Sequence, residues 1–152
     1  MIELEKKWLV DKEKCPIPSD AVKWDVIQGY LNTMSDEWII RCRYVGHDDG
    51  LSSYFLELKS RGLLAREELR YIIDKEEFDE TLKKCGGVVK KTRYLWKADN
   101  VQYEVDFYKD HKFVTCEVEF DNMKQCNAFK PPEWCIEDVT FNPKYKNVNL
   151  GK

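Results

Sequence analysis

Acidic side chains stand two positions apart in two short segments of this sequence. One is Glu3-x-Glu5, followed by Lys7, and the other is Glu117-x-Glu119. Side chains of a β-strand alternate between its faces, so each set would point to one side of a sheet. Hard divalent cations such as Mg²⁺ prefer carboxylate oxygens and share their coordination with phosphates. If the fold brings the two pairs together, they could hold one or two such ions. Either pair alone is more simply an exposed acidic stripe.

Basic side chains with the same period supply the complementary charge. Guanidinium groups hold phosphate oxygens in a bidentate way, whereas Lys acts as a point charge. Six cations facing one interior would repel one another unless a polyanion lay between them. A solvated outer face is the alternative, but the period-two register favours an interior lining. The six residues are Arg41, Arg43, Lys59, Arg66, Lys91 and Arg93.

The opposite faces of these segments are apolar and require a core under flanking helices. Their residues are Ile2, Leu4, Trp8, Ile40, Leu56, Leu58, Val105, Phe107, Val118 and Phe120. The pattern predicts strands over residues 2–10, 24–31, 37–45, 53–59, 65–73, 88–96, 101–109 and 113–121. Residues 32–36 and Asp99-Asn100 are expected as turns. The fold class is therefore mainly β (α+β), a closed eight-stranded antiparallel barrel with a few flanking helices. An open two-layer sheet is the alternative.

Three helical segments interrupt or follow the strands. Asp74 is a typical N-cap, and the helix after it should run to about Lys84 and stop at Gly86-Gly87. A short helix is expected near 122–128 and another in the segment 141–145. The helix after Asp74 has its apolar residues at helical spacing, so we expect it to cover apolar surface and not to bind a ligand.

Composition narrows the class of protein. The 152 residues fit a single domain, and 25 basic against 28 acidic residues give a net charge of −3, which favours neither nucleic acid nor an anionic membrane as a partner. The six cysteines lack zinc-type spacing, and no leader or membrane-spanning run is visible, so we expect reduced thiols and a cytoplasmic location. Neither a serine-hydrolase triad nor a Walker loop is present.

The whole chain resembles the CYTH superfamily, the triphosphate tunnel metalloenzymes, and in particular its short single-domain bacterial members. Glu3-x-Glu5-x-Lys7 is similar to the ExExK signature of that family, which is a weak pattern alone. The ordered set is highly specific. It continues with Arg41-Cys42-Arg43, Phe55-Leu56-Glu57-Leu58-Lys59, Ala65-Arg66-Glu67-Glu68, Lys91-Thr92-Arg93, Tyr103-Glu104-Val105-Asp106 and Cys116-Glu117-Val118-Glu119.

The resemblance implies an eight-stranded tunnel that binds a triphosphate, and it implies roles for named residues. Metal ligands would be Glu3, Glu5, Asp106, Glu117 and Glu119, with Glu104 nearby. Phosphate ligands would be Lys7, Arg41, Arg43, Lys59, Arg66 and Arg93. Lys91 would polarise the scissile phosphoryl group or its leaving oxygen, so the catalytic set is Lys91, Glu5 and Glu119. The implied cofactor is Mg²⁺ or Mn²⁺.

One residue departs from the family pattern. Two residues after the Glu68 position, where similar proteins carry a further Glu, this chain has Arg70. In regular register this would place a cation in the tunnel, whereas a one-residue bulge would turn Arg70 outward.

The function that this resemblance implies is metal-dependent hydrolysis of a linear triphosphate, chiefly inorganic tripolyphosphate to pyrophosphate and phosphate. The alternatives on the same fold are an adenylate cyclase and a thiamine or nucleoside triphosphatase, for which Trp24, Trp38 or Tyr54 could stack a base. A further alternative is a non-catalytic sensor of polyphosphate or nucleotide. The expected partner is a small-molecule triphosphate, and the expected state is a monomer or homodimer.

Overall fold

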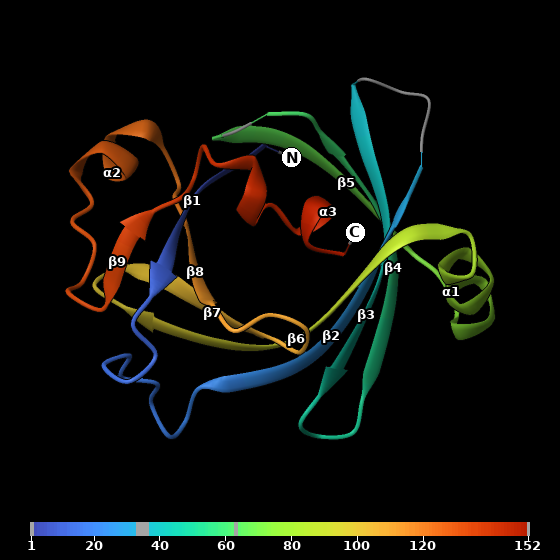
Figure 1. Ribbon diagram of the computed structural model, residues 1–152, viewed down its shortest axis with the longest axis horizontal. Coiled ribbons are helices and arrows are strands. Elements are labelled where there is room, and N and C mark those ends of the chain that lie inside the picture. The colour runs from blue at the N-terminus through green and yellow to red at the C-terminus, as the bar shows by residue number, and fades with distance from the viewer. Residues whose placement is uncertain (1, 33–36, 63, 152) are drawn as a thin grey trace.

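In the part of the chain that the structure describes, nine strands form most of the secondary structure. The computed structural model describes residues 2–32, 37–62 and 64–151. Within these ranges, Figure 1 shows the strands arranged as a ring. They are β1 (Ile2–Val10), β2 (Val22–Leu31), β3 (Trp38–His47), β4 (Ser52–Ser60), β5 (Ala65–Ile72), β6 (Cys85–Ala98), β7 (Val101–Tyr108), β8 (Val114–Glu119) and β9 (Cys135–Asp138).

Eight of these strands close into an antiparallel barrel. Their order is β5-β4-β3-β2-β6-β7-β8-β1, and β1 pairs back onto β5 through Ile2–Leu4 opposite Ala65–Glu67. The predicted closed barrel is confirmed, and the open two-layer sheet is wrong. Strand β9, which adds to the side of β1 outside the ring, was not predicted. At four residues, β9 is too short to show a period-two pattern.

The hairpin between β6 and β7 turns where the sequence indicates. Asp99 and Asn100 have φ angles of 55° and 64°. Positive φ at both central residues is the requirement of the tight turn that matches strand twist, and Asp and Asn tolerate it better than other side chains. The other expected turn, at residues 32–36, lies almost wholly outside the described residues.

Helix α1 (Lys75–Leu82) lies outside the barrel near β3 and β4 (Figure 1). Asp74 caps it in a reciprocal capping box with Glu77. The helix ends at Leu82, and Gly86-Gly87 belong to β6, so the expected glycine stop is wrong. The ring of Phe78 packs against Tyr44 and Tyr54 on the outer face of the sheet.

The expected short helix is confirmed as α2 (Met123–Ala128). The chain then ends with the 3₁₀ helix η1 (Pro143–Tyr145) and helix α3 (Asn147–Leu150). In Figure 1, which looks through the ring, α3 and the C-terminal end lie within its outline. The longest described helix has eight residues, and no described helix could cross a bilayer.

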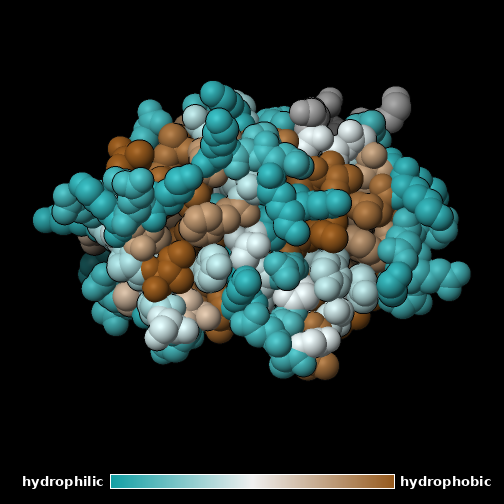
Figure 2. Space-filling model, turned by 60° about the horizontal axis from the view of Figure 1, so that its bottom comes forward, coloured by the Kyte–Doolittle hydropathy of each residue, from teal (hydrophilic) through white to brown (hydrophobic). Residues whose placement is uncertain are grey.

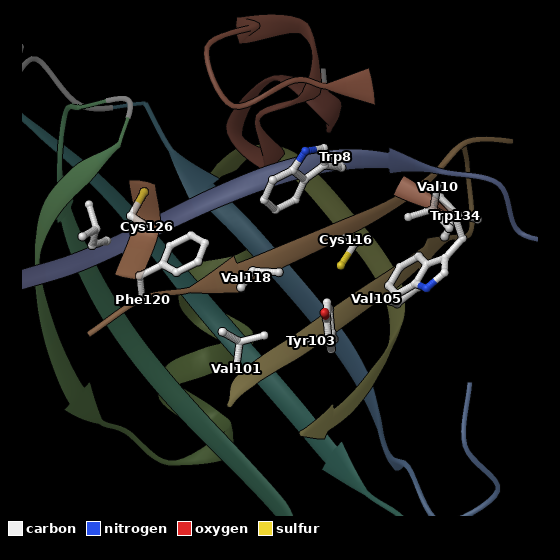
Figure 3. Packing of buried hydrophobic residues seen from close by; sticks show 12 residues of the cluster. Trp8, Val10, Val101, Tyr103, Val105, Cys116, Val118, Phe120, Cys126 and Trp134 are labelled. Atoms are coloured by element: carbon white, nitrogen blue, oxygen red, sulfur yellow. The ribbon is translucent and has the colours of Figure 1, made fainter. Parts of the chain in front are cut away.

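The main apolar core lies on the outer face of β1, β7 and β8. Figure 3 shows Trp8, Tyr103, Val105 and Val118 packed together with Trp134. Residues from α2 and from the segment before β9 cover this face. The core therefore lies outside the ring, and it leaves the interior to the other side chains of the same strands.

Some residues expected in the core are not buried. Leu4, Trp8, Val105, Val118 and Phe120 are buried, but Ile2 is 69% exposed, while Ile40, Leu56, Leu58 and Phe107 are only partly buried. The outer face of β5 carries exposed Leu69 and Tyr71. In Figure 2, apolar side chains form separate patches divided by hydrophilic ones.

Candidate active site

Strand alternation turns the charged residues into the barrel. In β8, Glu117 and Glu119 face inward, whereas Cys116 and Val118 belong to the outer core. The inward charges are deeply buried: Lys91 is 1% exposed, and Asp106 and Glu57 are 0% exposed. Charged groups this deep need partners, because burying an isolated charge is costly.

A cavity of about 160 Å³ runs between these charges. Its lining includes every expected phosphate ligand except Lys7 and every expected metal ligand except Asp106. It also includes Lys91. Residues from all eight strands of the ring, far apart in the sequence, thus meet around one space.

Asp106 is placed differently from the other expected metal ligands. Its Oδ2 accepts from Lys91 Nζ at 2.9 Å, and both its oxygens accept from Arg93, at 2.8 and 2.9 Å. Arg93 also bonds Glu104. Asp106 is thus a buried counter-ion that fixes the positions of Lys91 and Arg93, and its oxygens are taken up by that task.

Glu57, to which sequence reasoning gave no role, holds the arginines of the opposite wall. It accepts from Arg41 Nε at 2.9 Å and from Arg70 Nε at 2.7 Å, and Arg43 Nη1 lies 3.9 Å away. Arg70 pairs directly with Glu57 in the register between β4 and β5, with no bulge. The outward alternative for Arg70 is therefore wrong, and its side chain lies on the tunnel side.

Arg43 is the least satisfied cation of the interior. Among the described residues, its buried Nε and Nη2 have no hydrogen-bond partner. Burial, together with neighbouring Arg41 and Arg93, lowers the pKa of Arg43 to about 10. Buried donors without acceptors are costly, most of all on a charged group. The environment of Arg43 therefore favours an anion.

The acidic wall is formed where β1 meets β8 and β5. Glu3 accepts from Lys59 Nζ at 2.9 Å, and Glu5 accepts from Arg66 Nη2 at 2.9 Å. Glu5 stands opposite Glu119 in the register of β1 and β8. Barrel closure thus brings together the two acidic pairs that the sequence keeps more than a hundred residues apart.

Burial, together with carboxylate crowding, raises two pKa values on this wall. Burial and then Glu3, Glu104 and Glu5 raise the pKa of Glu119 to about 7, and burial and then Glu117 raise that of Glu5. A divalent cation offsets such repulsion, so the donor set fits one. Among the described residues, no three acidic, His or Cys side chains are already gathered as a metal-ligand group.

Lys91 has an unusual environment for an ammonium group. Burial lowers its pKa, Arg93 lowers it further, and Asp106 only partly offsets both, which leaves a pKa of about 7. A lysine with such a pKa exchanges its proton near neutral pH, which suits a proton donor in catalysis.

The C-terminal segment adds contacts that the sequence analysis missed. Lys7 Nζ donates to the carbonyl of Tyr145 at 2.6 Å, and Tyr108 donates to Asn147 Oδ1 at 3.1 Å. Lys7 and Lys146 line a smaller cavity of about 60 Å³, which shares Glu5, Arg41, Lys59, Arg66 and Glu117 with the larger one. Nothing in the local pattern of residues 145–147 signals this, because only folding brings them here.

The three aromatic residues expected to stack a base lie in different parts of the structure. Trp24 lines the tunnel cavity. Tyr54 packs against Phe78 of α1, outside the barrel. Trp38 lies on the same face of β3 as Cys42, which forms a short contact with Cys85 outside the tunnel. Only Trp24 keeps the expected position.

Comparisons with known proteins agree with this geometry. No family model matches the chain. The inorganic triphosphatase of Nitrosomonas europaea is 36% identical over 99% of this chain and 97% of its own length. That of Acetivibrio thermocellus is 30% identical over 99% and 93%. The crystal structure of the inorganic triphosphatase NE1496 superimposes with a TM-score of 0.70 and 33% identity, over 98% of this chain and 93% of that one. Identity at this level over nearly the full length, joined to the closed charged barrel, shows that the chain belongs to the CYTH-like triphosphate tunnel family, together with these inorganic triphosphatases.

Proposed function

We propose that this protein hydrolyses a linear triphosphate, chiefly inorganic tripolyphosphate, to pyrophosphate and phosphate. The observation that carries the proposal is Arg43, a buried guanidinium on the tunnel wall whose Nε and Nη2 have no partner among the described residues. Phosphate oxygens are the acceptors that such a fork matches best. The names of the two curated relatives support the same substrate class.

The basic wall would bind and orient the substrate. Arg41, Arg43 and Arg93 reach the cavity from β3 and β6, while Lys59 and Arg66 reach it from β4 and β5. Lys7 would act from the smaller cavity next to it. Fixed cations of this kind stabilise the charge that shifts onto phosphate oxygens in the transition state, because they need no reorganisation during the reaction.

The acidic wall would hold the divalent cation, which we propose to be Mg²⁺ or Mn²⁺. Glu3, Glu5, Glu117 and Glu119 are the ligands that line the cavity. When bound, such an ion supplies Lewis-acid activation of the attacking water and neutralises phosphate charge. Asp106 is better explained as the residue that positions Lys91 and Arg93, since its oxygens already bond them.

Proton transfer would fall to Lys91 on one side and to the Glu5–Glu119 pair on the other. Lys91, with a pKa of about 7, would give a proton to the bridging oxygen as the phosphoanhydride bond breaks. Glu119, which stands opposite Glu5 in the register of β1 and β8, would accept a proton from the attacking water. All six cysteines are free thiols, which supports a reducing, cytoplasmic setting.

The test is phosphate release from tripolyphosphate, with Mg²⁺, Mn²⁺ or EDTA. Release that needs the metal supports the proposal. Lys91→Ala should reduce the rate by about 100-fold or more, a typical value for a general acid. Lys90→Ala, its exposed neighbour on the outer face, is the matched control and should not change the rate. Binding of tripolyphosphate without any turnover would instead identify a sensor.

A second candidate is a triphosphate that carries an organic group, such as ATP or thiamine triphosphate. Trp24 and Leu95 line both the tunnel cavity and an adjoining cavity of about 430 Å³, which Pro18 and Trp96 also line. Such a surface could receive an aromatic base. Faster metal-dependent turnover of ATP or thiamine triphosphate than of tripolyphosphate would favour this candidate, and cyclic AMP with pyrophosphate as products would identify a cyclase.

A further inference from the structure

Arg70 is the arginine of the interior that reaches toward the opening of the tunnel. Its side chain is 48% exposed, whereas those of Arg41 and Arg43 are 9% and 7% exposed. All three lie around the same carboxylate, that of Glu57. Arg70 also lines the tunnel cavity. The arginines thus form a row that leads from the buried interior to solvent.

Positive charge is in excess along this row. Two carboxylates face three guanidinium groups: all three guanidinium groups lie within 3.9 Å of the oxygens of Glu57, and Arg70 Nη2 also lies 3.4 Å from Glu68 Oε1. Arg41 already bonds one oxygen, Oε1, while Arg70 bonds the other through Nε and Nη2 at 2.7 and 2.6 Å. An anion that entered the opening could therefore bind Arg70 while Glu57 kept its buried partner.

The guanidinium of Arg70 is held in place for such a contact. Its Cζ lies 4.7 Å from the centre of the Phe55 ring, on the tunnel wall. Stacking on the ring and the bonds to Glu57 restrict the side chain, so less conformational entropy is lost when it binds a ligand. A guanidinium offers five donors, more than Glu57 and Glu68 together occupy.

We infer that Arg70 is a specificity-determining residue that binds phosphoryl groups of inorganic polyphosphates longer than triphosphate. This rests on the proposed function, because the inner cations must hold the first three phosphoryl groups. Arg41 and Arg70 bind the two oxygens of one carboxylate, that of Glu57. Arg70 therefore lies close enough to the inner arginines to contact a fourth phosphoryl group of the same linear chain. Arg70 then adds a contact for tetrapolyphosphate and longer chains that a chain of three does not make.

The competing explanation is that Arg70 only neutralises buried Glu57. Loss of Arg70 would then displace Arg41 and Arg43 and reduce activity by the same factor on every substrate. A specificity role predicts a loss that depends on chain length. The ratio of kcat/KM for tetrapolyphosphate to that for tripolyphosphate separates the two explanations, because a merely structural defect does not change it.

The experiment compares wild type, Arg70→Ala, Arg70→Lys and the outer-face control Lys90→Ala on both substrates with Mg²⁺. We expect the tetrapolyphosphate-to-tripolyphosphate ratio to fall by about tenfold in Arg70→Ala, the effect of one charge-assisted bidentate contact. Arg70→Lys keeps the charge and should fall in between, and Lys90→Ala should leave the ratio unchanged. Equal losses on both substrates, or none on either, would overturn the inference.

A failure of the proposed function can be distinguished from a failure of the inference about Arg70. If wild type hydrolyses neither substrate, calorimetric titration of both polyphosphates in EDTA decides the inference. Tighter binding of tetrapolyphosphate by wild type, lost in Arg70→Ala, supports it. Equal affinities for the two chains in wild type overturn it.

Discussion

The inner and outer faces of the barrel bury opposite kinds of side chain, although the same strands form both. In β8, Glu117 faces the tunnel and Val118, the next residue, is wholly buried in the outer core. In β7, Asp106 and Val105 divide in the same way, and both are 0% exposed. Neighbouring residues are thus equally buried, one by pairing with charged side chains and the other by packing against apolar ones.

This difference separates stability from function. Burial of apolar surface stabilises a fold by about 25 cal/mol per Å². A buried ion pair often contributes little, because the desolvation of its charges offsets their attraction. The outer face therefore stabilises the barrel, and the charged interior is best explained by a ligand. Changes on the inner face should alter activity first, and changes on the outer face should alter stability first.

The largest effect should follow a change on the acidic wall. Glu119→Gln should lower phosphate release from tripolyphosphate by about 100-fold or more, as loss of a key charge in an active site does. Its free energy of unfolding should stay the same or rise slightly, because Glu119 is repelled by Glu3, Glu104 and Glu5. Urea unfolding and the phosphate assay measure the two quantities. Glu137→Gln, on exposed β9, is the control, and full activity in Glu119→Gln would contradict the assignment.

The matching change on the outer face is Trp134→Ala. Trp134 packs against Tyr103 and Trp96 outside the tunnel. Its loss should reduce the free energy of unfolding by about 3–5 kcal/mol, as for other large aromatic deletions. Activity per folded molecule should persist. Ile136→Ala, at a 62% exposed position nearby, should change stability by less than about 0.5 kcal/mol. A large loss of activity in folded Trp134→Ala would break the separation of the two faces.

A substitution of Glu57 measures how much the charged interior contributes to the free energy of unfolding. Although burial alone would raise its pKa, Arg41 and Arg43 lower the pKa of Glu57 below its usual value of 4.5. A carboxyl with a lowered folded pKa stabilises the protein above its unfolded pKa, and this contribution is lost as pH falls. Glu57→Gln should therefore cost about 3 kcal/mol at pH 7, the usual cost of breaking a buried pair.

Urea unfolding at pH 7, 4 and 3 measures this contribution. The difference between wild type and Glu57→Gln should shrink as pH falls below about 4, where the unfolded carboxyl becomes protonated. A difference that stays constant over this range would show that the charge of Glu57 does not stabilise the fold.

The smallest effect should come from the cap of α1. Asp74 accepts from the Glu77 amide at 2.8 Å, so Asp74→Ala should cost about 1 kcal/mol of stability. The helix lies outside the ring, so turnover should not change. Asp110→Ala, at an exposed turn, is the control. Loss of activity in folded Asp74→Ala would show that the outer helix influences the tunnel.

Local pattern was enough to predict eight of the nine described strands and α1, and it favoured a closed barrel over an open two-layer sheet. Alternation of charged and apolar residues fixed which face of β1, β7 and β8 turned inward, because the side-chain period of a strand is two. It could not say which outer residues would be covered. Ile2 and Leu4 look alike in the sequence, yet only Leu4 meets the core.

Contacts between distant segments could not be predicted from sequence. The charges of Asp106, Glu57 and Arg70 were visible, but their partners depend on how β4 pairs with β5 and how β6 pairs with β7. The sequence alone thus determined the family and the charged lining and favoured a closed barrel, since these follow from ordered motifs and short-range periodicity. Only the tertiary structure decided that Asp106 holds Lys91, that Glu57 gathers three arginines and that Arg70 faces the opening, because side-chain pairing depends on register and closure.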